Sequence, residues 1–192
     1  MPDHSFTDFF RNLLDHPNIE VHLGIEALDH LSVVDDQIFL DGASSDILIV
    51  YTGALDELFR CEYGRLPYRS LRFEWRYSEK DSYQEAPVVA YPQEAGYTRI
   101  TEYKKLPVQT GKGTSYALEY PVPYEEGSGA APYYPVLTDA SQALYRKYYE
   151  KAVQIKNLIF CGRLADFKYY NMDQALERAL RVADSIIENR QV

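Results

Sequence analysis

The chain has 192 residues, of which 26% are charged and 46% hydrophobic, and this composition is ordinary for a globular protein with a buried core. The net charge of -9 argues against general binding to nucleic acid or to an anionic membrane, because both need a basic surface. No apolar run is long enough to span a membrane and no signal peptide is visible, so we expect a cytoplasmic protein.

The cysteines and histidines do not have the pattern of a metal site. Cys61 and Cys161 lack the spacing of metal ligands, and all four histidines lie near the N-terminus without cysteines or carboxylates arranged around them. We therefore expect no bound metal. Two unpatterned cysteines also favour a reducing compartment over a disulfide.

The first part of the chain predicts a helix, a strand and a hairpin. Apolar side chains between Phe6 and Leu14 fall on one helical face, and Ser5 is placed to cap that helix. Residues 19–23 alternate between apolar and polar types, as in a strand. Val33-Val34 and the apolar residues 38–40, on the two sides of Asp35-Asp36, predict a hairpin.

The middle of the chain predicts an antiparallel sheet. Before it, an apolar run over residues 46–51 predicts a strand covered on both faces, and residues 55–59 predict a short helix. Aromatic-rich segments then follow one another without intervening helices, which is typical of antiparallel pairing. We predict these strands over residues 71–77, 87–91, 97–103 and 114–120.

The last part predicts a helix, a strand and a second helix. Residues 139–155 have helical periodicity, and residues 157–160 read as a buried strand that runs into Cys161-Gly162-Arg163. A long amphipathic helix begins around residues 171–174. A strand, a Gly-Arg turn and a helix whose N-terminus faces the turn can hold an anionic ligand with backbone N–H groups.

These elements together predict an α/β fold of mixed α+β character. We expect an antiparallel β-sheet lobe over residues 61–135, inserted between elements of an incomplete Rossmann-like α/β layer formed by residues 1–60 and 136–192. The chain contains no G-x-G-x-x-G motif, so the Gly-rich half of a dinucleotide site is absent from it.

The first group that can carry chemistry is Tyr97-Thr98-Arg99-Ile100-Thr101-Glu102. On an alternating strand Tyr97, Arg99 and Thr101 share one face, which puts an arginine beside an aromatic ring. Such an arginine can hold a phosphate bidentately. Alternatively, Arg99 forms an exposed cross-strand ion pair that contributes little.

Two further groups lie later in the chain. The prolines of Pro132-Tyr133-Tyr134-Pro135 stiffen a loop that presents two tyrosines for stacking on a base or a sugar, or the loop packs its own aromatics. In the segment from Gly162 to Gln174, Asn171 and Gln174 form a capping pair. The same helix terminus, with its partial positive charge, can face an electron-rich edge of a ligand.

Taken in order, these segments resemble UDP-galactopyranose mutase over essentially the whole chain. The motifs that carry the resemblance are Tyr51-Thr52-Gly53, Gly64-Arg65-Leu66-Pro67-Tyr68-Arg69-Ser70-Leu71, Tyr97-Thr98-Arg99-Ile100-Thr101-Glu102, Pro132-Tyr133-Tyr134-Pro135 and Gly162-Arg163-Leu164 through Tyr169-Tyr170-Asn171-Met172-Asp173. The resemblance implies the C-terminal half of an enzyme that interconverts UDP-galactopyranose and UDP-galactofuranose. In that family reduced FAD supplies the nucleophile.

The resemblance also assigns roles to residues. Arg99 matches a catalytic arginine that contacts the substrate diphosphate. The other substrate-binding matches are Tyr133, Tyr134, Tyr169 and Asn171, and the cofactor-binding matches are Gly162, Arg163, Asn171, Met172 and Asp173. Asn171 stands where many members carry Asp, and Ala54 stands where a Pro is common.

The absence of the Gly-rich motif implies that the chain alone neither holds FAD stably nor turns over. Its expected partners are UDP-galactose and the missing N-terminal half of the same protein, with a homodimer as a further option. Two other functions stay open. One is a non-catalytic module that binds a nucleotide sugar or a glycan, and the other is half of a different flavoprotein, such as an amine-oxidase-like enzyme.

Overall fold

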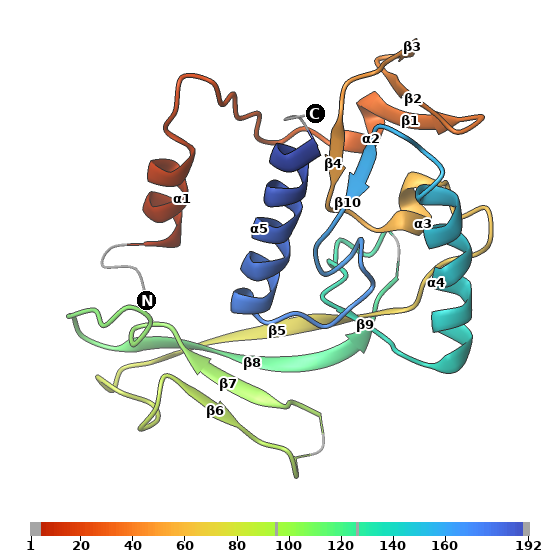
Figure 1. Cartoon of the computed structure of the whole chain (residues 1–192). Helices are drawn as coiled ribbons and strands as arrows, with labels where there is room; N and C mark the ends of the chain where they lie inside the picture. Colours follow the sequence, from red (N-terminus) through yellow and green to blue (C-terminus); the bar gives the residue numbers. More distant parts are fainter. Residues whose placement is uncertain (1–4, 95, 126, 190–192) are drawn as a thin grey trace. The chain divides into compact units, whose positions relative to one another are not determined.

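The computed structural model describes residues 5–94, 96–125 and 127–189. The chain divides into two compact units, and each unit is built from two separate stretches of sequence. The first unit contains residues 1–25 and 70–130, and the second contains residues 26–69 and 131–192. Helices and antiparallel strands both occur (Figure 1), which confirms the mixed α+β class.

The first unit begins with helix α1 (Phe6–Leu14). Ser5 caps it as predicted, because the Ser5 Oγ accepts the backbone N–H of Asp8 at 3.0 Å. None of the α1 residues, all of which the structure describes, is buried. The predicted strand over residues 19–23 was wrong, since this part of the described chain pairs with no neighbouring strand and runs as an irregular segment.

Four strands of a five-stranded sheet carry residues of the first unit, in the order β6 (Val88–Ala90), β7 (Arg99–Glu102), β8 (Thr114–Pro123) and β5 (Tyr68–Ser78), and the fifth strand, next to β5, belongs to the second unit. The β6–β7 and β7–β8 pairs are antiparallel, so the predicted antiparallel sheet is confirmed. Its core is a cluster of Ile100, Tyr116 and Leu118, against which the rings of Tyr91, Tyr97 and Tyr120 pack.

The second unit opens with helix α2 (Ala27–His30) and a small antiparallel sheet of β1 (Leu31–Val34), β2 (Gln37–Leu40) and β3 (Ala43–Ser44). Asp35 and Asp36 join β1 to β2 with φ values of 48° and 58°. Positive φ at both central residues is the geometry of the tight turn that matches the twist of a hairpin. The predicted hairpin is therefore confirmed.

A short parallel pair joins the two stretches of the second unit. Strand β4 (Ile49–Tyr51) pairs with β10 (Leu158–Phe160), although they are more than a hundred residues apart in sequence (Figure 1). The predicted strand over residues 46–51 is thus shorter than expected. It is also not covered on both faces, since Ile47 and Val50 are 61% and 45% exposed.

Three helices and one short strand complete this unit. They are α3 (Leu55–Leu58), β9 (Tyr134–Pro135), α4 (Asp139–Ala152) and α5 (Met172–Asn189). Helix α4 lies against α3, and the fully buried ring of Tyr148 stacks on Phe59 at 6.2 Å. The first two residues of β5 pair with β9, with Tyr68 opposite Pro135 and Arg69 opposite Tyr134.

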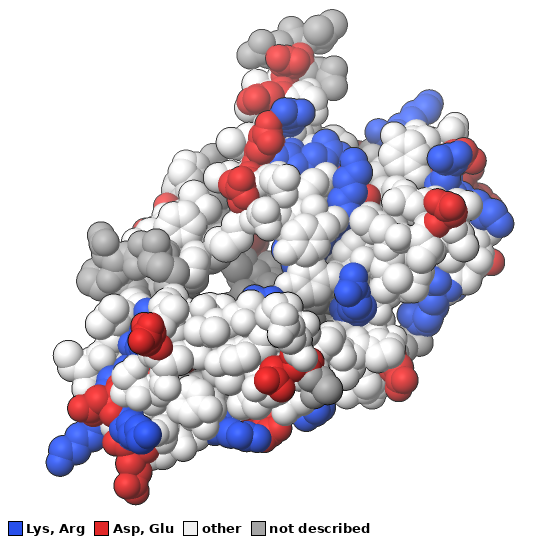
Figure 2. All heavy atoms as spheres, turned by 90° about the horizontal axis from the view of Figure 1, so that it is seen from below, with Lys and Arg blue, Asp and Glu red and all other residues white. Residues whose placement is uncertain are grey.

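The surface carries both signs of charge and several apolar side chains. On the face seen in Figure 2, Lys and Arg are interspersed with Asp and Glu, with uncharged areas between them. Helix α5 exposes more than half of each of four apolar side chains, namely Met172, Leu176, Leu180 and Ile187. Among the described helices, none is both long enough and apolar enough to cross a membrane.

Candidate functional site

Four of the predicted site residues meet in the second unit, and we call them the Tyr–Arg cluster: Tyr133, Tyr134, Arg163 and Tyr169. The rings of Tyr134 and Tyr169 stack at 5.3 Å with an interplanar angle of 17°. The guanidinium carbon of Arg163 lies 5.1 Å from the centre of the Tyr134 ring and 5.5 Å from that of Tyr169. A cation over two ring faces is attracted by both, so the cluster is held together by its own contacts.

Arg163 also fastens the two segments that carry the tyrosines. Its Nη1 donates to the carbonyl oxygen of Tyr133 at 3.2 Å, and its Nη2 donates to that of Tyr170 at 2.5 Å. A guanidinium has five N–H donors, so these two bonds leave donor capacity for a ligand. Tyr169 is 55% exposed, which leaves its ring and hydroxyl accessible.

The turn between β10 and α5, which leads to this cluster, contains the buried carboxylate of Asp166. Asp166 is only 8% exposed, and its Oδ2 accepts the backbone N–H of Gly162 at 3.0 Å, the hydroxyl of Tyr170 at 3.1 Å and Nε of Arg178 at 3.1 Å. Burial and the charge of Asp166 raise the pKa of the Tyr170 hydroxyl, so the hydroxyl remains a donor. Three parts of the chain therefore converge on one side chain.

The start of α5 carries the remaining predicted residues of this unit. The side-chain oxygen of Gln174 accepts the backbone N–H of Asn171 at 2.9 Å, so the predicted capping contact is confirmed in this direction. Asn171, Met172 and Asp173 are all exposed. The first-turn N–H groups of a helix have no intrahelical acceptor, and they present a partial positive charge to solvent at this exposed end.

Arg99, the predicted catalytic residue, lies in the first unit on β7. It faces Glu119 of β8 in the ladder, and its Nε is 3.3 Å from Oε2 of that glutamate. The cross-strand ion pair considered from the sequence is therefore present. From the sequence we expected this pair to be exposed. The Glu119 side chain is only 7% exposed, whereas that of Arg99 is 43% exposed.

The prediction that Tyr97 shares a face with Arg99 was wrong. The Tyr97 ring packs on the Ile100 cluster, on the other side of the sheet from the Arg99–Glu119 pair. The reason is that β7 begins at Arg99, so the alternation of a regular strand does not extend back to Tyr97. Among the described residues, no aromatic ring lies over the Arg99 guanidinium.

Glu102, the last residue of the same motif, has a structural position. Its carboxylate is fully buried and accepts the backbone N–H groups of Tyr83 and Gln84 at 3.0 and 3.1 Å and the hydroxyl of Thr114 at 2.8 Å. Burial alone would raise its pKa, but these bonds and the nearby Lys105 outweigh burial, and the pKa is lowered. Glu102 therefore fastens the loop before β6 as a carboxylate.

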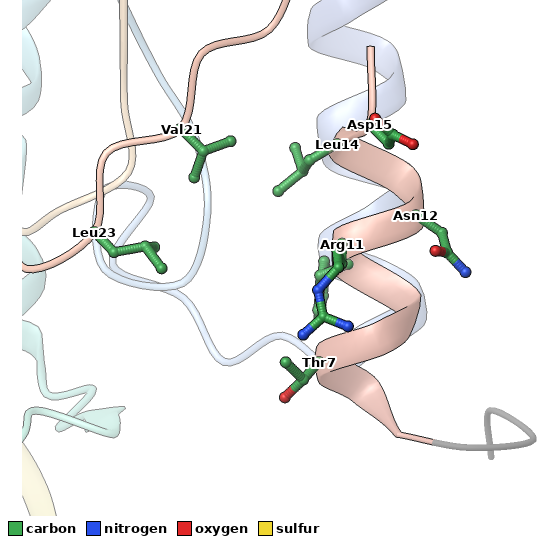
Figure 3. A pocket seen from close by; sticks show the side chains of 8 residues that line it. Thr7, Arg11, Asn12, Leu14, Asp15, Val21 and Leu23 are labelled. Atoms are coloured by element: carbon green, nitrogen blue, oxygen red, sulfur yellow. The ribbon is translucent and has the colours of Figure 1, made fainter.

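An apolar hollow in the first unit contains none of the predicted site residues. Its volume is about 600 Å³, and it lies between α1 and the segment that follows it. Val21 and Leu23 point from that segment toward the side of α1 that carries Leu14 (Figure 3).

The described residues contain no group of His, Cys, Asp and Glu side chains suited to a metal ion.

Comparisons with known proteins agree with this set of motifs. The family model described as "UDP-galactopyranose mutase" matches residues 1–169. The chain belongs to the UDP-galactopyranose mutase family. This confirms the resemblance drawn from the ordered motifs.

Individual relatives of this family are about one-third identical to the chain. A dTDP-fucopyranose mutase of Escherichia coli is 35% identical over 98% of this chain and 49% of its own length. A UDP-galactopyranose mutase of Mycoplasma genitalium is 34% identical over 97% of this chain and 47% of its own length. A probable UDP-galactopyranose mutase of Klebsiella pneumoniae is 33% identical over 98% and 46%. The chain thus spans about half the length of the curated relatives it matches.

Sequence reasoning missed Asp166 and Arg178. Asp166 bonds to Gly162 and Tyr170 of the family motif, and Arg178 bonds to Asp166. They are twelve residues apart, and only Arg178 lies in α5, so no helical spacing relates them. Their one signal in the sequence is that they are an acidic and a basic residue close to the family motif. That signal is weak, because most charged residues are exposed.

Proposed function

We propose that the chain is the C-terminal part of a flavin-dependent mutase that interconverts UDP-galactopyranose and UDP-galactofuranose. The Tyr–Arg cluster at the start of α5 is the observation that supports this most strongly. It gathers four residues that the family motif assigns to substrate or cofactor. A packing-only role for the loop around Tyr133 and Tyr134 would not need the Tyr169 ring to be left half exposed.

In this proposal the second unit binds the diphosphate of the substrate. The hydroxyl groups of Tyr134 and Tyr169 donate to phosphate oxygens, with Tyr133 beside them. Asn171 both donates and accepts, and it adds no negative charge, so it does not repel a diphosphate. Because Arg163 already holds the loops that carry these tyrosines, little side-chain entropy remains to be lost when the ligand binds.

Arg99 is the proposed catalytic residue of the first unit. Its guanidinium neutralises charge on the departing diphosphate and orients that group. The pair with Glu119 on the neighbouring strand orients the side chain, and its 43% exposure leaves part of the guanidinium accessible to a phosphate. The proposal requires the guanidinium to bind both carboxylate and phosphate, which a planar fork with five donors permits.

The residues at the turn before α5 fit the FAD that the family implies. The first-turn N–H groups of α5 are exposed and suit an electron-rich ring edge, and Met172 offers a 71% exposed apolar side chain beside them. Gly162 has a φ of 102°, a conformation that favours glycine, and Arg163 follows it. When bound, reduced FAD supplies the nucleophile for the anomeric carbon. The residues that would hold and orient FAD are Gly162, Arg163, Asn171, Met172 and Asp173.

We further propose that the isolated chain is inactive and needs the rest of the mutase fold to retain FAD. Neither Cys61 nor Cys161 is in a disulfide, which suits a cytoplasmic protein. UDP-galactose is the proposed substrate. The dTDP-fucopyranose mutase relative makes a dTDP sugar the natural competitor in any test of specificity.

Calorimetry with the isolated chain separates the proposal from its rival. UDP, UDP-galactose and dTDP are each titrated with and without reduced FAD. Silence in all titrations supports an incomplete active site, whereas tight UDP binding without flavin supports a binding module. Conversion of UDP-galactofuranose by the chain and reduced FAD alone would contradict the proposed inactivity.

Activity is tested in a chimera in which this chain replaces the matching part of the Mycoplasma genitalium enzyme. Arg99→Ala is expected to lower kcat/KM by about 10- to 100-fold, as for loss of a charge-assisted phosphate contact. Arg181→Ala is the matched control, because Arg181 is exposed in an ion pair with Glu177 on α5. Equal kcat/KM in the two variants would remove Arg99 from the catalytic role.

A further inference from the structure

The Asp166–Arg178 pair joins three elements of the second unit that the sequence separates. Arg178 Nε and Nη2 donate to the two carboxylate oxygens of Asp166 at 3.1 and 3.3 Å, as a bidentate fork. The same Nη2 also donates to the carbonyl oxygen of Phe160, the last residue of β10, at 3.2 Å. One guanidinium on α5 therefore fixes the end of β10 and the turn that follows it.

Asp166 in turn closes the segment between β10 and α5. Its Oδ2 accepts the N–H of Gly162 at the start of the segment and the hydroxyl of Tyr170 near its end. The N–H of Asp166 donates back to the carbonyl oxygen of Gly162 at 2.9 Å. Phe167 has a φ of 46° and is buried, so this turn has a backbone conformation that an L residue rarely adopts.

The contacts of the Asp166–Arg178 pair indicate what a bidentate ion pair does at this place. The Asp166 end of this ion pair is buried and loses its hydration, whereas the Arg178 side chain is 36% exposed, so the pair gains little net stability over apolar packing. The more specific use of such a pair is to select one geometry. The segment that this pair fastens runs from Gly162 to Asp173, and it includes Arg163, Tyr169 and Met172.

From these contacts we propose that Asp166 and Arg178 are positioning residues, which set the register of α5 against the end of β10 and so place the ligand-binding residues between Gly162 and Asp173. The inference rests on the proposed function for the roles of the residues that are placed. It does not rest on that function for the placement itself. Neither Asp166 nor Arg178 touches the ligand in this scheme.

The chain offers a selective probe of the start of α5. It contains two methionines, Met1 and Met172, so a chain labelled with [15N]methionine gives at most two amide resonances. The resonance that the substitution Met172→Leu removes belongs to the first residue of α5. Amide shifts follow local hydrogen bonding and backbone geometry, so this resonance reports on the placement of the helix start.

The variants are Arg178→Gln and Asp166→Asn, with Arg181→Gln as the control. Arg181 lies on the same helix, and its side chain pairs with Glu177 while 73% exposed. We expect both Arg178→Gln and Asp166→Asn to move or broaden the Met172 amide resonance and the control to leave it unchanged. Urea unfolding of each variant is measured in parallel.

A purely stabilising role makes a different prediction. In that case Arg178→Gln lowers the urea midpoint but leaves the Met172 resonance of the folded chain where it was, and the proposal is overturned. If Arg178→Gln or Asp166→Asn does not fold, Tyr170→Phe removes only one of the donors to Asp166. It must then shift the resonance in a folded chain, and an unchanged resonance overturns the proposal.

A second measurement separates this inference from the proposed function. UDP and reduced FAD are titrated into the chimera with the Mycoplasma genitalium enzyme, and failure of both to bind argues against the proposed substrate and cofactor. The response of the Met172 amide to the Asp166 and Arg178 variants is measured in the isolated chain and needs neither ligand. A shift of that amide without ligand binding by the chimera would therefore keep the positioning role and remove the proposed function.

Discussion

Arg99 lies directly opposite Glu119 across the β7–β8 ladder, and its Nε is 3.3 Å from Oε2 of the carboxylate. The other carboxylate oxygen accepts the hydroxyl of Thr101 at 2.7 Å. The glutamate is nearly buried and the arginine is not, so the pair orients Arg99 while leaving part of it open to solvent. The proposed catalytic arginine thus begins from a fixed position, with its charge balanced before any ligand arrives.

Arg99→Ala is expected to lower the free energy of unfolding by about 1–3 kcal/mol, because it leaves the buried Glu119 carboxylate with only the Thr101 hydroxyl and its charge uncompensated. Urea unfolding followed by circular dichroism measures the loss. Arg181→Ala is the control, since its exposed pair should be worth about 0–0.5 kcal/mol. Equal losses in the two variants would show that the Arg99–Glu119 pair adds nothing.

Tyr148→Phe is expected to destabilise the second unit by about 1–3 kcal/mol. The buried Tyr148 hydroxyl donates to the carbonyl oxygen of Gly64 at 2.7 Å and accepts the N–H of Tyr63 at 3.0 Å. Phenylalanine keeps the ring but leaves both backbone groups without that partner. Tyr149→Phe, at a 45% exposed position of the same helix, should change the urea midpoint little. The reverse ranking would contradict the buried hydrogen bonds.

Glu102 should make the stability of the chain depend on pH at the acid end. Its folded pKa lies below the ordinary value of 4.5, so the unfolded state binds its proton first as the pH falls. The stability that this carboxylate adds is therefore present above the unfolded pKa, and it disappears as the pH falls through the folded pKa.

We expect Glu102→Gln to be less stable than the parent chain near neutral pH, with a difference that shrinks toward pH 3, as measured by urea unfolding at a series of pH values between about 6 and about 3. The exposed Glu188→Gln serves as the control for the same change of side chain at the surface. A difference for Glu102→Gln that stays constant with pH would mean that its ionised form is not favoured by folding.

Asp36→Gly should stabilise the β1–β2 hairpin by about 0.5–1 kcal/mol, because glycine adopts positive φ without the cost that an L side chain meets there. Asp36→Ala has the same change of charge but no such freedom, so it should be less stable than the glycine variant. Thermal unfolding of both variants provides the measurement. An alanine variant at least as stable as the glycine variant would rule out turn strain as the cause.

Local sequence patterns were sufficient for the elements whose stability is local. Ser5 with Asp8 predicted the start of α1, and the Asp35-Asp36 turn predicted a hairpin, because capping and turn chemistry act within a few residues. Residues 19–23 show the opposite case. Their alternation fits a strand, but a strand also needs a partner, and no pattern within the segment can supply one.

The candidate site could be predicted only in part for a related reason. The ordered motifs named Tyr134, Arg163 and Tyr169 individually, and the structure adds that their rings and guanidinium are in contact. The ion pair between the buried Asp166 and the half-buried Arg178 depends on how α5 packs on the turn, which no short-range pattern encodes. For Tyr97 the error came from extending a regular alternation past the first residue of β7.

The short ladder between β5 and β9 makes it feasible to shorten the protein. The chain leaves the second unit after Arg69 and re-enters it at Ala131. Arg69 pairs with Tyr134 and accepts the N–H of Tyr133 at 2.9 Å, so the points of exit and return are neighbours. A tight loop of about two to five residues can bridge such antiparallel ends. Excising residues 70–130 would then give a miniature that keeps the Tyr–Arg cluster and the start of α5, in which the unfolding of the second unit can be measured separately from the sheet that carries Arg99.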